Sequence, residues 1–148
     1  MKIFDCTTFY SEHLIMDVRF NVLNEHVHKF IVSESTFSHS GKPKKLNFDI
    51  NNYPKFKDKI IYIIIDKEPN DIIRIEDKLL TTVDKRSNSV KRIELSYDYM
   101  AKSLEIALDN DLIILSDNDE IPNLGSKKFK NSNKDIFIFK QLFFYFFS

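Results

Sequence analysis

The stretch that decides the fold is Leu112-Ile113-Ile114-Leu115-Ser116-Asp117-Asn118-Asp119-Glu120-Ile121-Pro122. It begins with a short, uninterrupted apolar run, which predicts a strand buried on both faces, as in a parallel sheet covered by helices. Acidic residues end the run, and Pro122 cannot continue the hydrogen-bond ladder of a central strand. Because ligands of open α/β sheets bind beyond the carboxyl ends of the strands, we expect a ligand site directly after this strand.

The acidic residues after the strand have a spacing that suits a metal ion. Asp117 and Asp119 are two residues apart, so in an extended segment both carboxylates leave the same side of the chain. Two carboxylates can hold Mg²⁺ or Mn²⁺ and leave coordination positions for water and a diphosphate. A solvated acidic turn is the alternative interpretation, because Asp-x-Asp is a short and frequent pattern.

Composition bounds the class of protein. The chain has 148 residues, enough for a single domain over residues 1–148 with one core. Its 22 Lys and Arg balance 22 Asp and Glu, so bulk charge does not predict a nucleic-acid partner. Only 2 glycines are present, and neither a Walker A sequence nor a Gly-x-Gly-x-x-Gly loop occurs. Phosphate binding would therefore need a metal or basic side chains.

Cysteine content and hydropathy bear on location. The only cysteine, Cys6, excludes an internal disulfide and fits a reducing compartment, so we expect a cytoplasmic protein. Cys6 lies in an apolar strand-like run, which favours a buried, inert thiol over a nucleophile. No stretch approaches the roughly 20 apolar residues of a membrane helix, so no transmembrane segment is expected.

Hydrophobic patterns predict alternating strands and helices. Strands are expected over residues 2–9, 29–35, 60–65, 112–116 and 135–147. A polar loop is expected over 36–45 and a short helical turn over 51–57, whereas residues 67–88 carry mixed signals. Alternation of this kind favours an α/β fold whose mostly parallel sheet is flanked by helices through right-handed crossovers.

Two amphipathic helices are predicted between these strands. The first is capped by Ser11, and Glu12 suits the positive end of its dipole. Its wide buried face is expected to contain Ile15, Val18 and Val22, flanked by Met16, Phe20, Leu23 and Val27. Arg19 lies on the same helix, where an ion pair inside the fold is favoured over ligand contact. The second helix repeats apolar residues at spacings of three and four, at Ile93, Tyr97, Met100, Leu104 and Leu108.

Three segments, in order along the chain, together carry a family resemblance. The first is Lys2-Ile3-Phe4-Asp5-Cys6 with Phe9, Glu12 and Arg19. The second is Val32-Ser33-Glu34-Ser35-Thr36-Phe37-Ser38-His39-Ser40-Gly41-Lys42-Pro43-Lys44, and the third is residues 111–122. These segments resemble glycosyltransferase family 17, the β-1,4-mannosyl-glycoprotein β-1,4-N-acetylglucosaminyltransferase-like enzymes. The second is similar to that family's Val-x-Glu-Ser-Thr-x-x-His-Ser-Gly-Lys-Pro-Lys, and the third to its Asp-x-Asp-Glu-Ile-Pro segment, so the resemblance spans residues 2–122.

The resemblance implies a GT-A-like, Rossmann-type glycosyltransferase. Its expected donor is a UDP-sugar, UDP-N-acetylglucosamine, its acceptor is a glycan, and its cofactor is Mn²⁺ or Mg²⁺ bound by Asp117 and Asp119. The donor would also contact the residues that follow the first two strands, Asp5, Phe9, Glu34, Ser35, His39 and Lys42. Glu34 has an alternative role as a hydrogen-bond acceptor that fixes the loop after its strand, and loop lysines such as Lys42 and Lys44 are usually solvated.

Two further positions follow from the resemblance. Arg92, with Glu94, stands where the family carries an Arg-Glu pair, and is a candidate donor contact. Tyr97-Asp98-Tyr99 occupies the region of the family's Gln-Arg-Asn, so the arginine of that motif is missing here. Glu120 would hold a metal-bound water or, alternatively, is an exposed turn residue.

Family members extend beyond this point, so we expect the chain to be a C-terminally truncated donor-binding part of the fold. Inverting sugar transfer needs a base for the acceptor hydroxyl, and Asp135 is a weak candidate within residues 125–148. The main hypothesis is a metal-dependent, inverting hexosyltransferase. The alternatives are a catalytically incomplete remnant that binds nucleotide-sugar, and an unrelated Mg²⁺ phosphotransferase, which fits the acids but not the Glu-Ser-Thr to Lys-Pro-Lys loop. The oligomeric state stays unassigned.

Overall fold

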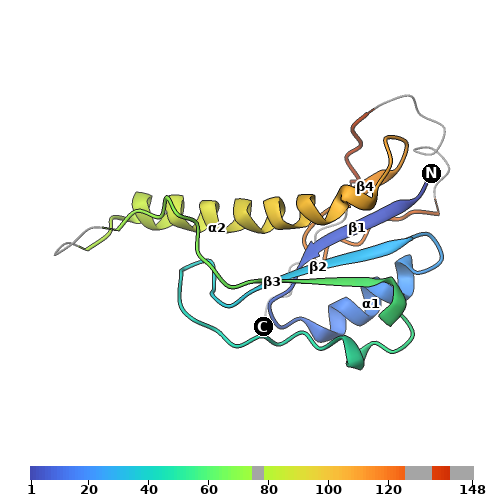
Figure 1. The fold of residues 1–148 in the computed structure, drawn as a ribbon, viewed down its shortest axis with the longest axis horizontal. Helices are drawn as coiled ribbons and strands as arrows, with labels where there is room; N and C mark the ends of the chain where they lie inside the picture. Colours follow the sequence, from blue (N-terminus) through green and yellow to red (C-terminus); the bar gives the residue numbers. More distant parts are fainter. Residues whose placement is uncertain (75–78, 126–134, 141–148) are drawn as a thin grey trace.

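The fold is built on a parallel sheet. A computed structural model describes residues 1–74, 79–125 and 135–140. Within these residues four parallel strands lie in the order β3-β2-β1-β4 (Figure 1). Their bounds are Ile3–Thr8 for β1, Lys29–Ser35 for β2, Ile60–Ile65 for β3 and Leu112–Leu115 for β4. The predicted α/β fold is therefore confirmed, and β2 and β3 have the predicted bounds.

The registers of the strands bring several carboxyl ends to one edge of the sheet. Thr8 at the end of β1 lies opposite Ser33 of β2, and Leu115 at the end of β4 lies opposite Cys6 of β1. The loops that follow β1, β2 and β4 therefore start close together. This is the edge at which α/β sheets bind ligands.

Helix α1, His13–Leu23, connects β1 to β2. Its N-cap is Glu12 rather than the predicted Ser11, and no side chain caps the helix. Instead the Glu12 carboxylate accepts hydrogen bonds from the preceding backbone N–H groups of Tyr10 and Ser11. The predicted buried face is partly wrong, because Val18 and Val22 are exposed. The residues predicted to flank that face, Met16, Phe20, Leu23 and Val27, are buried together with Arg19.

Side chains of each strand alternate between two apolar layers. Phe30 and Val32 of β2 pack with α1 and with the aromatic residues of the 48–56 segment. Ile31 of β2, with Phe4 and Cys6 of β1, packs instead with Met100 of α2. The two helices therefore cover opposite faces of the sheet (Figure 1). Burial raises the pKa of the Cys6 thiol to about 12, helped by the nearby charge of Asp5, which confirms the buried, unreactive cysteine.

Helix α2, Thr82–Ser103, begins earlier than the hydrophobic pattern predicted. Thr81 and Asp84 form a reciprocal capping box that fixes its start. Its buried residues are spaced four apart and are mostly polar: Asn88, Arg92, Ser96 and Met100. Apolar periodicity identified Met100 but not the polar residues of this face. Two residues predicted to lie on it are exposed: Tyr97, and Leu108, which lies beyond the end of the helix. Short 3₁₀ turns follow at Leu104–Ile106 and occur earlier at Ile50–Asn52 and Lys57–Lys59.

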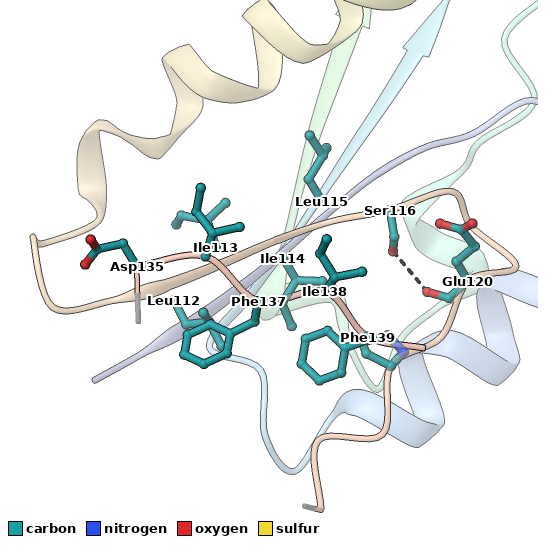
Figure 2. A pocket seen from close by; sticks show the side chains of 12 residues that line it. Leu112, Ile113, Ile114, Leu115, Ser116, Glu120, Asp135, Phe137, Ile138 and Phe139 are labelled. Carbon is teal, nitrogen blue, oxygen red and sulfur yellow. Dashed lines mark hydrogen bonds between the residues drawn. The ribbon is translucent and has the colours of Figure 1, made fainter. Parts of the chain in front are cut away.

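Strand β4 lies at the edge of the described sheet, so the prediction that it is buried on both faces is wrong. Ile114 is buried, whereas Ile113 and Leu115 are 39% and 52% exposed. The physical reason is that α2 packs over β2 and β3. Residues 135–140 carry no strand, and residues 135–139 line a groove of about 510 Å³ together with β4 (Figure 2). The rest of the strand predicted to reach residue 147 lies outside the described residues.

No helix in the part of the chain that the structure describes is long and apolar enough to cross a membrane.

Candidate functional site

A pocket of about 570 Å³, lined mainly by residues with polar side chains, opens at the carboxyl ends of β1 and β2, and its volume is typical of small-molecule sites. Five segments line it: the end of β1 with residues 8–12, the end of β2, the following loop 37–44, Ser96 of α2 and the acidic turn 117–119. Most of the lining groups are hydroxyls, carboxylates and aromatic rings. The pocket therefore suits a polar ligand that combines planar or cyclic groups with charge.

Five of the residues predicted from the sequence line this pocket. They are Phe9, Ser35, His39, Asp117 and Asp119. Phe9 is buried at the end of β1, whereas His39 and the two aspartates are exposed. Segments far apart in the chain thus meet at the sheet edge where the sequence placed a ligand site.

The other five predicted residues do not line the pocket. Asp5 lies inside β1 rather than at its end, and its carboxylate is buried. Glu34 and Arg92 are buried in ion pairs described below. Lys42 is exposed on the loop, and Glu120 lines the groove beside β4. The positions of these five residues do not test whether they bind a donor. Asp5, Glu34 and Arg92 each form an ion pair inside the protein.

Arg19 joins the first strand to the acidic turn. The Arg19 side chain is fully buried, and its Nε and Nη2 donate to the two carboxylate oxygens of Asp5 at 2.8 and 2.7 Å. Nη2 also donates to Ser116 Oγ at 2.8 Å. Nη1 donates to the backbone carbonyl of Asp117 at 2.8 Å and to those of Asn118 and Glu120 at 3.2 and 3.3 Å. The predicted internal ion pair is confirmed, and the same guanidinium holds the backbone that carries Asp117 and Asp119.

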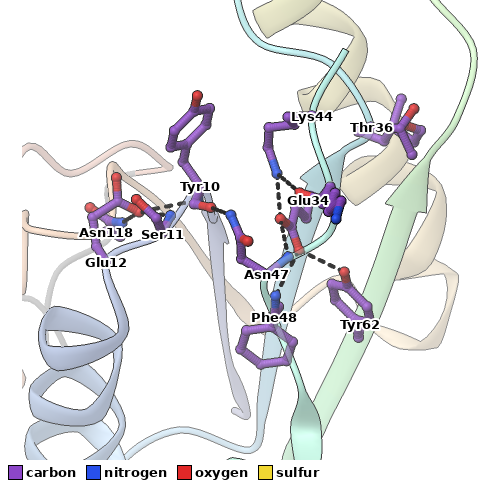
Figure 3. Close-up of polar contacts among 12 residues, drawn as sticks. Tyr10, Ser11, Glu12, Glu34, Thr36, Lys44, Asn47, Phe48, Tyr62 and Asn118 are labelled. Carbon is purple, nitrogen blue, oxygen red and sulfur yellow. Dashed lines mark hydrogen bonds and ion pairs between the residues drawn. The ribbon is translucent and has the colours of Figure 1, made fainter.

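The acidic segment is a turn, as the alternative interpretation of Asp-x-Asp expected, and not the extended segment in which both carboxylates would leave the same side of the chain. The backbone N–H of Glu120 donates to the carbonyl of Asp117 at 3.0 Å, and Ser116 Oγ donates to the Glu120 carbonyl at 3.0 Å. Asn118 Nδ2 donates to the Glu12 carboxylate at 2.9 Å, which connects the turn to the start of α1 (Figure 3). Asp117 and Asp119 are left exposed, with both side chains on the pocket.

Glu12 adds a negative charge to the pocket wall. Partial burial opposes ionisation, but hydrogen bonds from the backbone N–H groups of Ser11 and Tyr10 and from the side chain of Asn118 outweigh it. The net effect is a lowered pKa for the Glu12 carboxyl. Glu12 is therefore an anion at neutral pH and is already used as an acceptor by these neighbours.

A divalent cation fits this turn only if a ligand or water completes its coordination. Within residues 1–74, 79–125 and 135–140, no three His, Cys, Asp or Glu side chains form a cluster able to hold a metal ion. Asp117 and Asp119 offer exposed carboxylate oxygens, the ligand type that Mg²⁺ and Mn²⁺ prefer. Mg²⁺ is usually held by one or two carboxylates together with phosphate and water oxygens, which matches such a pair.

Glu34 fixes the loop that follows β2, as its alternative interpretation predicted. Its buried carboxylate pairs with Lys44 and accepts from the backbone N–H groups of Asn47 and Phe48 at 2.8 and 3.0 Å. The Tyr62 hydroxyl donates to it at 2.7 Å (Figure 3). Burial opposes ionisation, but the Lys44 ammonium and these donors together lower the pKa of Glu34. Lys44, a pocket residue, lies with its ammonium 5.0 Å from the Tyr10 ring centre.

Arg92 fixes the same loop from the side of α2. Its guanidinium pairs with Glu68 at 2.6 Å and donates to the backbone carbonyl of His39 at 3.0 Å. Gly41 has a φ of +82°, and a side chain there would press against the Arg92 guanidinium, 2.8 Å from its Cζ. A glycine is therefore required where the loop turns against α2. Arg92 and Glu34 hold the two sides of the loop that presents His39.

Sequence analysis did not assign several pocket residues to the site. Thr8, Ser33 and Ser38 are short polar residues without a motif of their own, and only the strand registers bring the first two together. Ser96 could have been found by its four-residue spacing from Arg92 along α2. No signal in the sequence alone identifies Ser33, because its burial depends on the packing of α2.

The fold and the pocket together define the class of protein: an α/β protein with a candidate ligand site at the carboxyl edge of a parallel sheet, next to a turn that carries two aspartates. A scan against protein-family models matches residues 1–147 to glycosyltransferase family 17. The chain therefore belongs to glycosyltransferase family 17, which supports a glycosyltransferase role with a donor and an acceptor substrate. No curated protein and no solved structure matched the chain.

Replacing Arg19 by Lys should remove most of the contacts that hold the acidic turn. A lysine has one charged nitrogen and cannot reach Asp5, Ser116 and the turn carbonyls together. We expect the free energy of unfolding, measured by urea denaturation, to fall by about 2–4 kcal/mol, because several buried acceptors lose their donor at a cost of about 1–3 kcal/mol each. Arg86→Lys, on the exposed surface of α2, is the control and should change it by less than about 0.5 kcal/mol. Equal effects in both variants would contradict this role for Arg19.

Glu34→Gln should destabilise the protein and alter its response to acid. Because the folded pKa of Glu34 is lowered, the unfolded chain binds its proton more readily, and stability is lost as pH falls below about 4.3 and through the folded pKa. We expect a loss on the order of 2 kcal/mol at pH 7 and a shallower fall in acid than in wild type. Unfolding curves from pH 7 to 3 measure both, with exposed Glu25→Gln as the control. An acid profile identical to wild type would refute the assignment.

Proposed function

We propose that the chain binds a UDP-sugar, with N-acetylglucosamine as the sugar, in the pocket at the ends of β1 and β2. The proposed reaction is inverting transfer of that sugar to a glycan acceptor, with Mn²⁺ or Mg²⁺ at Asp117 and Asp119. One observation carries the proposal. Arg19 holds the acidic turn beside the strand ends, so that both aspartates line one pocket with Phe9, Ser35 and His39.

The chemistry of the pocket supports a nucleotide-sugar. A divalent cation would supply Lewis-acid neutralisation of the charge that develops on the departing diphosphate. Asp117 and Asp119 would hold the cation and position the diphosphate at the mouth of the pocket. Aromatic groups at Phe9, Tyr10 and Phe37 can pack against a planar base or a sugar ring. Ser35 and His39 would supply hydrogen bonds to the uncharged parts of the donor.

A second candidate is a donor-binding protein that does not complete the transfer. Asp135, the base candidate named from the sequence, lines the groove beside β4 and not the pocket (Figure 2). A base must lie within hydrogen-bond reach of the acceptor hydroxyl. In this arrangement Asp135 would not meet an acceptor placed against a donor in the pocket, which favours binding without turnover.

The proposal predicts cation-dependent UDP binding that requires both aspartates. In the double variant Asp117→Asn with Asp119→Asn, the Kd for UDP in the presence of Mn²⁺ should rise by at least about tenfold, because two charged ligands are lost. Since both side chains are exposed, the Tm should stay near that of wild type. Isothermal titration with and without Mn²⁺ measures binding. Asp109 is exposed and precedes the N-terminal end of β4, at the opposite end of this strand from the acidic turn. The control variant Asp109→Asn should bind UDP with the affinity of wild type.

Turnover separates the two candidate functions. UDP release from UDP-N-acetylglucosamine, compared with UDP-glucose, in the presence of a mixed glycan acceptor identifies a transferase and its sugar preference. Binding of Mn²⁺ and UDP without release of UDP supports the donor-binding protein instead. Absence of UDP binding, or binding unchanged in the double variant, would refute both.

A further inference from the structure

Ser33 carries a buried hydroxyl for which the described residues offer no hydrogen-bond partner. Its residue exposure is 1%, and its Oγ makes no hydrogen bond with any group that the structure describes. Buried side-chain hydroxyls in proteins nearly always have a hydrogen-bond partner. Ser33 also lines the pocket. Its Oγ is closed off in the free protein, so a molecule in the pocket would supply the missing partner after rotation of the Ser33 side chain about χ1.

The position of Ser33 places this hydroxyl on a neutral part of the pocket wall. Side chains of β2 alternate, and Ser33 shares the face of Ile31, which packs toward α2. The residue opposite it in the neighbouring strand is Thr8, and Ser35 follows on the same face. Thr8, Ser33 and Ser35 all line the pocket. Two adjacent strand ends therefore present three uncharged hydroxyl side chains to it.

The chemistry of this wall selects the kind of group it can bind. A hydroxyl both donates and accepts hydrogen bonds, which suits a carbonyl, an amide or another hydroxyl. Phosphates are bound in proteins chiefly by cations, backbone N–H groups and metals, and the carboxylates for a metal lie on the 117–119 turn. We propose that Ser33 Oγ hydrogen bonds a neutral polar group of the donor, on its base or its sugar, and determines affinity for that group. This rests on the proposed function.

An unpaired buried hydroxyl also affects the free protein. A buried hydroxyl without a partner loses its hydrogen bonds to water when the protein folds. Its replacement by an apolar side chain of similar size should therefore leave the stability of the folded protein unchanged or raise it. Binding sites often sacrifice stability in this way. The role of Ser33 in ligand binding therefore predicts opposite effects of one substitution on stability and on affinity, which a purely structural serine would not show.

The test compares Ser33→Ala with Ser103→Ala. Ser103 Oγ already donates to the carbonyl of Met100 at 2.6 Å and does not line the pocket. Isothermal titration with UDP and with UDP-N-acetylglucosamine, both with Mn²⁺, gives the affinities, and thermal unfolding without ligand gives the Tm. We expect the Kd of Ser33→Ala to rise at least about fivefold with an equal or higher Tm, and the Kd of Ser103→Ala to stay within about twofold of wild type.

The two ligands locate the partner group. A loss of affinity for both ligands places it on the nucleoside, and a loss for UDP-N-acetylglucosamine alone places it on the sugar. An unchanged Kd in Ser33→Ala, equal losses in both variants, or a lower Tm in Ser33→Ala overturns the inference, the last because it indicates a structural hydroxyl bonded to water. These outcomes leave the proposed function standing when wild type binds. Failure of wild type to bind either ligand refutes both.

Discussion

The structure depends on one buried guanidinium. Arg19 is fully enclosed, and an unpaired charge there would be prohibitively unfavourable. All three of its nitrogens donate, to the Asp5 carboxylate, to Ser116 Oγ and to three carbonyls of the acidic turn. The turn must therefore take the conformation that satisfies the arginine. The exposed aspartates it carries are placed by a group that never touches the pocket.

The opposite wall of the pocket is built in a similar way. Glu34 from β2 and Arg92 from α2 are buried or nearly buried ions, and each bonds the loop that presents His39. Their charges are compensated inside the protein, by Lys44 and Glu68 respectively. Buried ions that are paired in this way contribute little net stability but disfavour other arrangements of the loop. Three buried charges thus define the geometry of a site whose lining is mostly neutral.

The fold could be predicted because strands leave a strong local signal. The apolar runs that became β2 and β3 are long enough to give their bounds directly. Apolar periodicity predicted a second helix and its buried Met100, but it missed the start of α2 and the buried polar residues Asn88, Arg92 and Ser96. Asn88 and Arg92 make hydrogen bonds to other parts of the chain, which leave no apolar pattern in the sequence. Strand β4 was also predicted, but its expected burial on both faces was wrong, because the apolar composition of Ile113 and Leu115 does not reveal that α2 leaves them uncovered.

The candidate site was predicted where family motifs and chemistry coincide, and less well where packing decides. Asp117, Asp119, Phe9, Ser35 and His39 meet at the pocket as expected. Asp5 and Glu34 belong to the same motifs, but their carboxylates face inward to Arg19 and to the loop. A sequence motif identifies residues that occur together in a family. It does not distinguish the residues that bind the ligand from those that hold the ligand-binding residues in position. Ser33, in contrast, was not predicted from the sequence and is identified by its place in the pocket and by a hydroxyl without a partner among the described residues.

The central claim is that the acidic turn and the ends of β1 and β2 form a single ligand site. The most direct test is paramagnetic broadening in ¹H–¹⁵N spectra of the whole chain with UDP, comparing Mn²⁺ with diamagnetic Mg²⁺. The account predicts that Mn²⁺ broadens the amide signals of residues 117–119 together with those of residues 8–10 and 33–40, and spares those at the start of β3. Broadening confined to the acidic turn, or centred on residues outside the pocket, would contradict it.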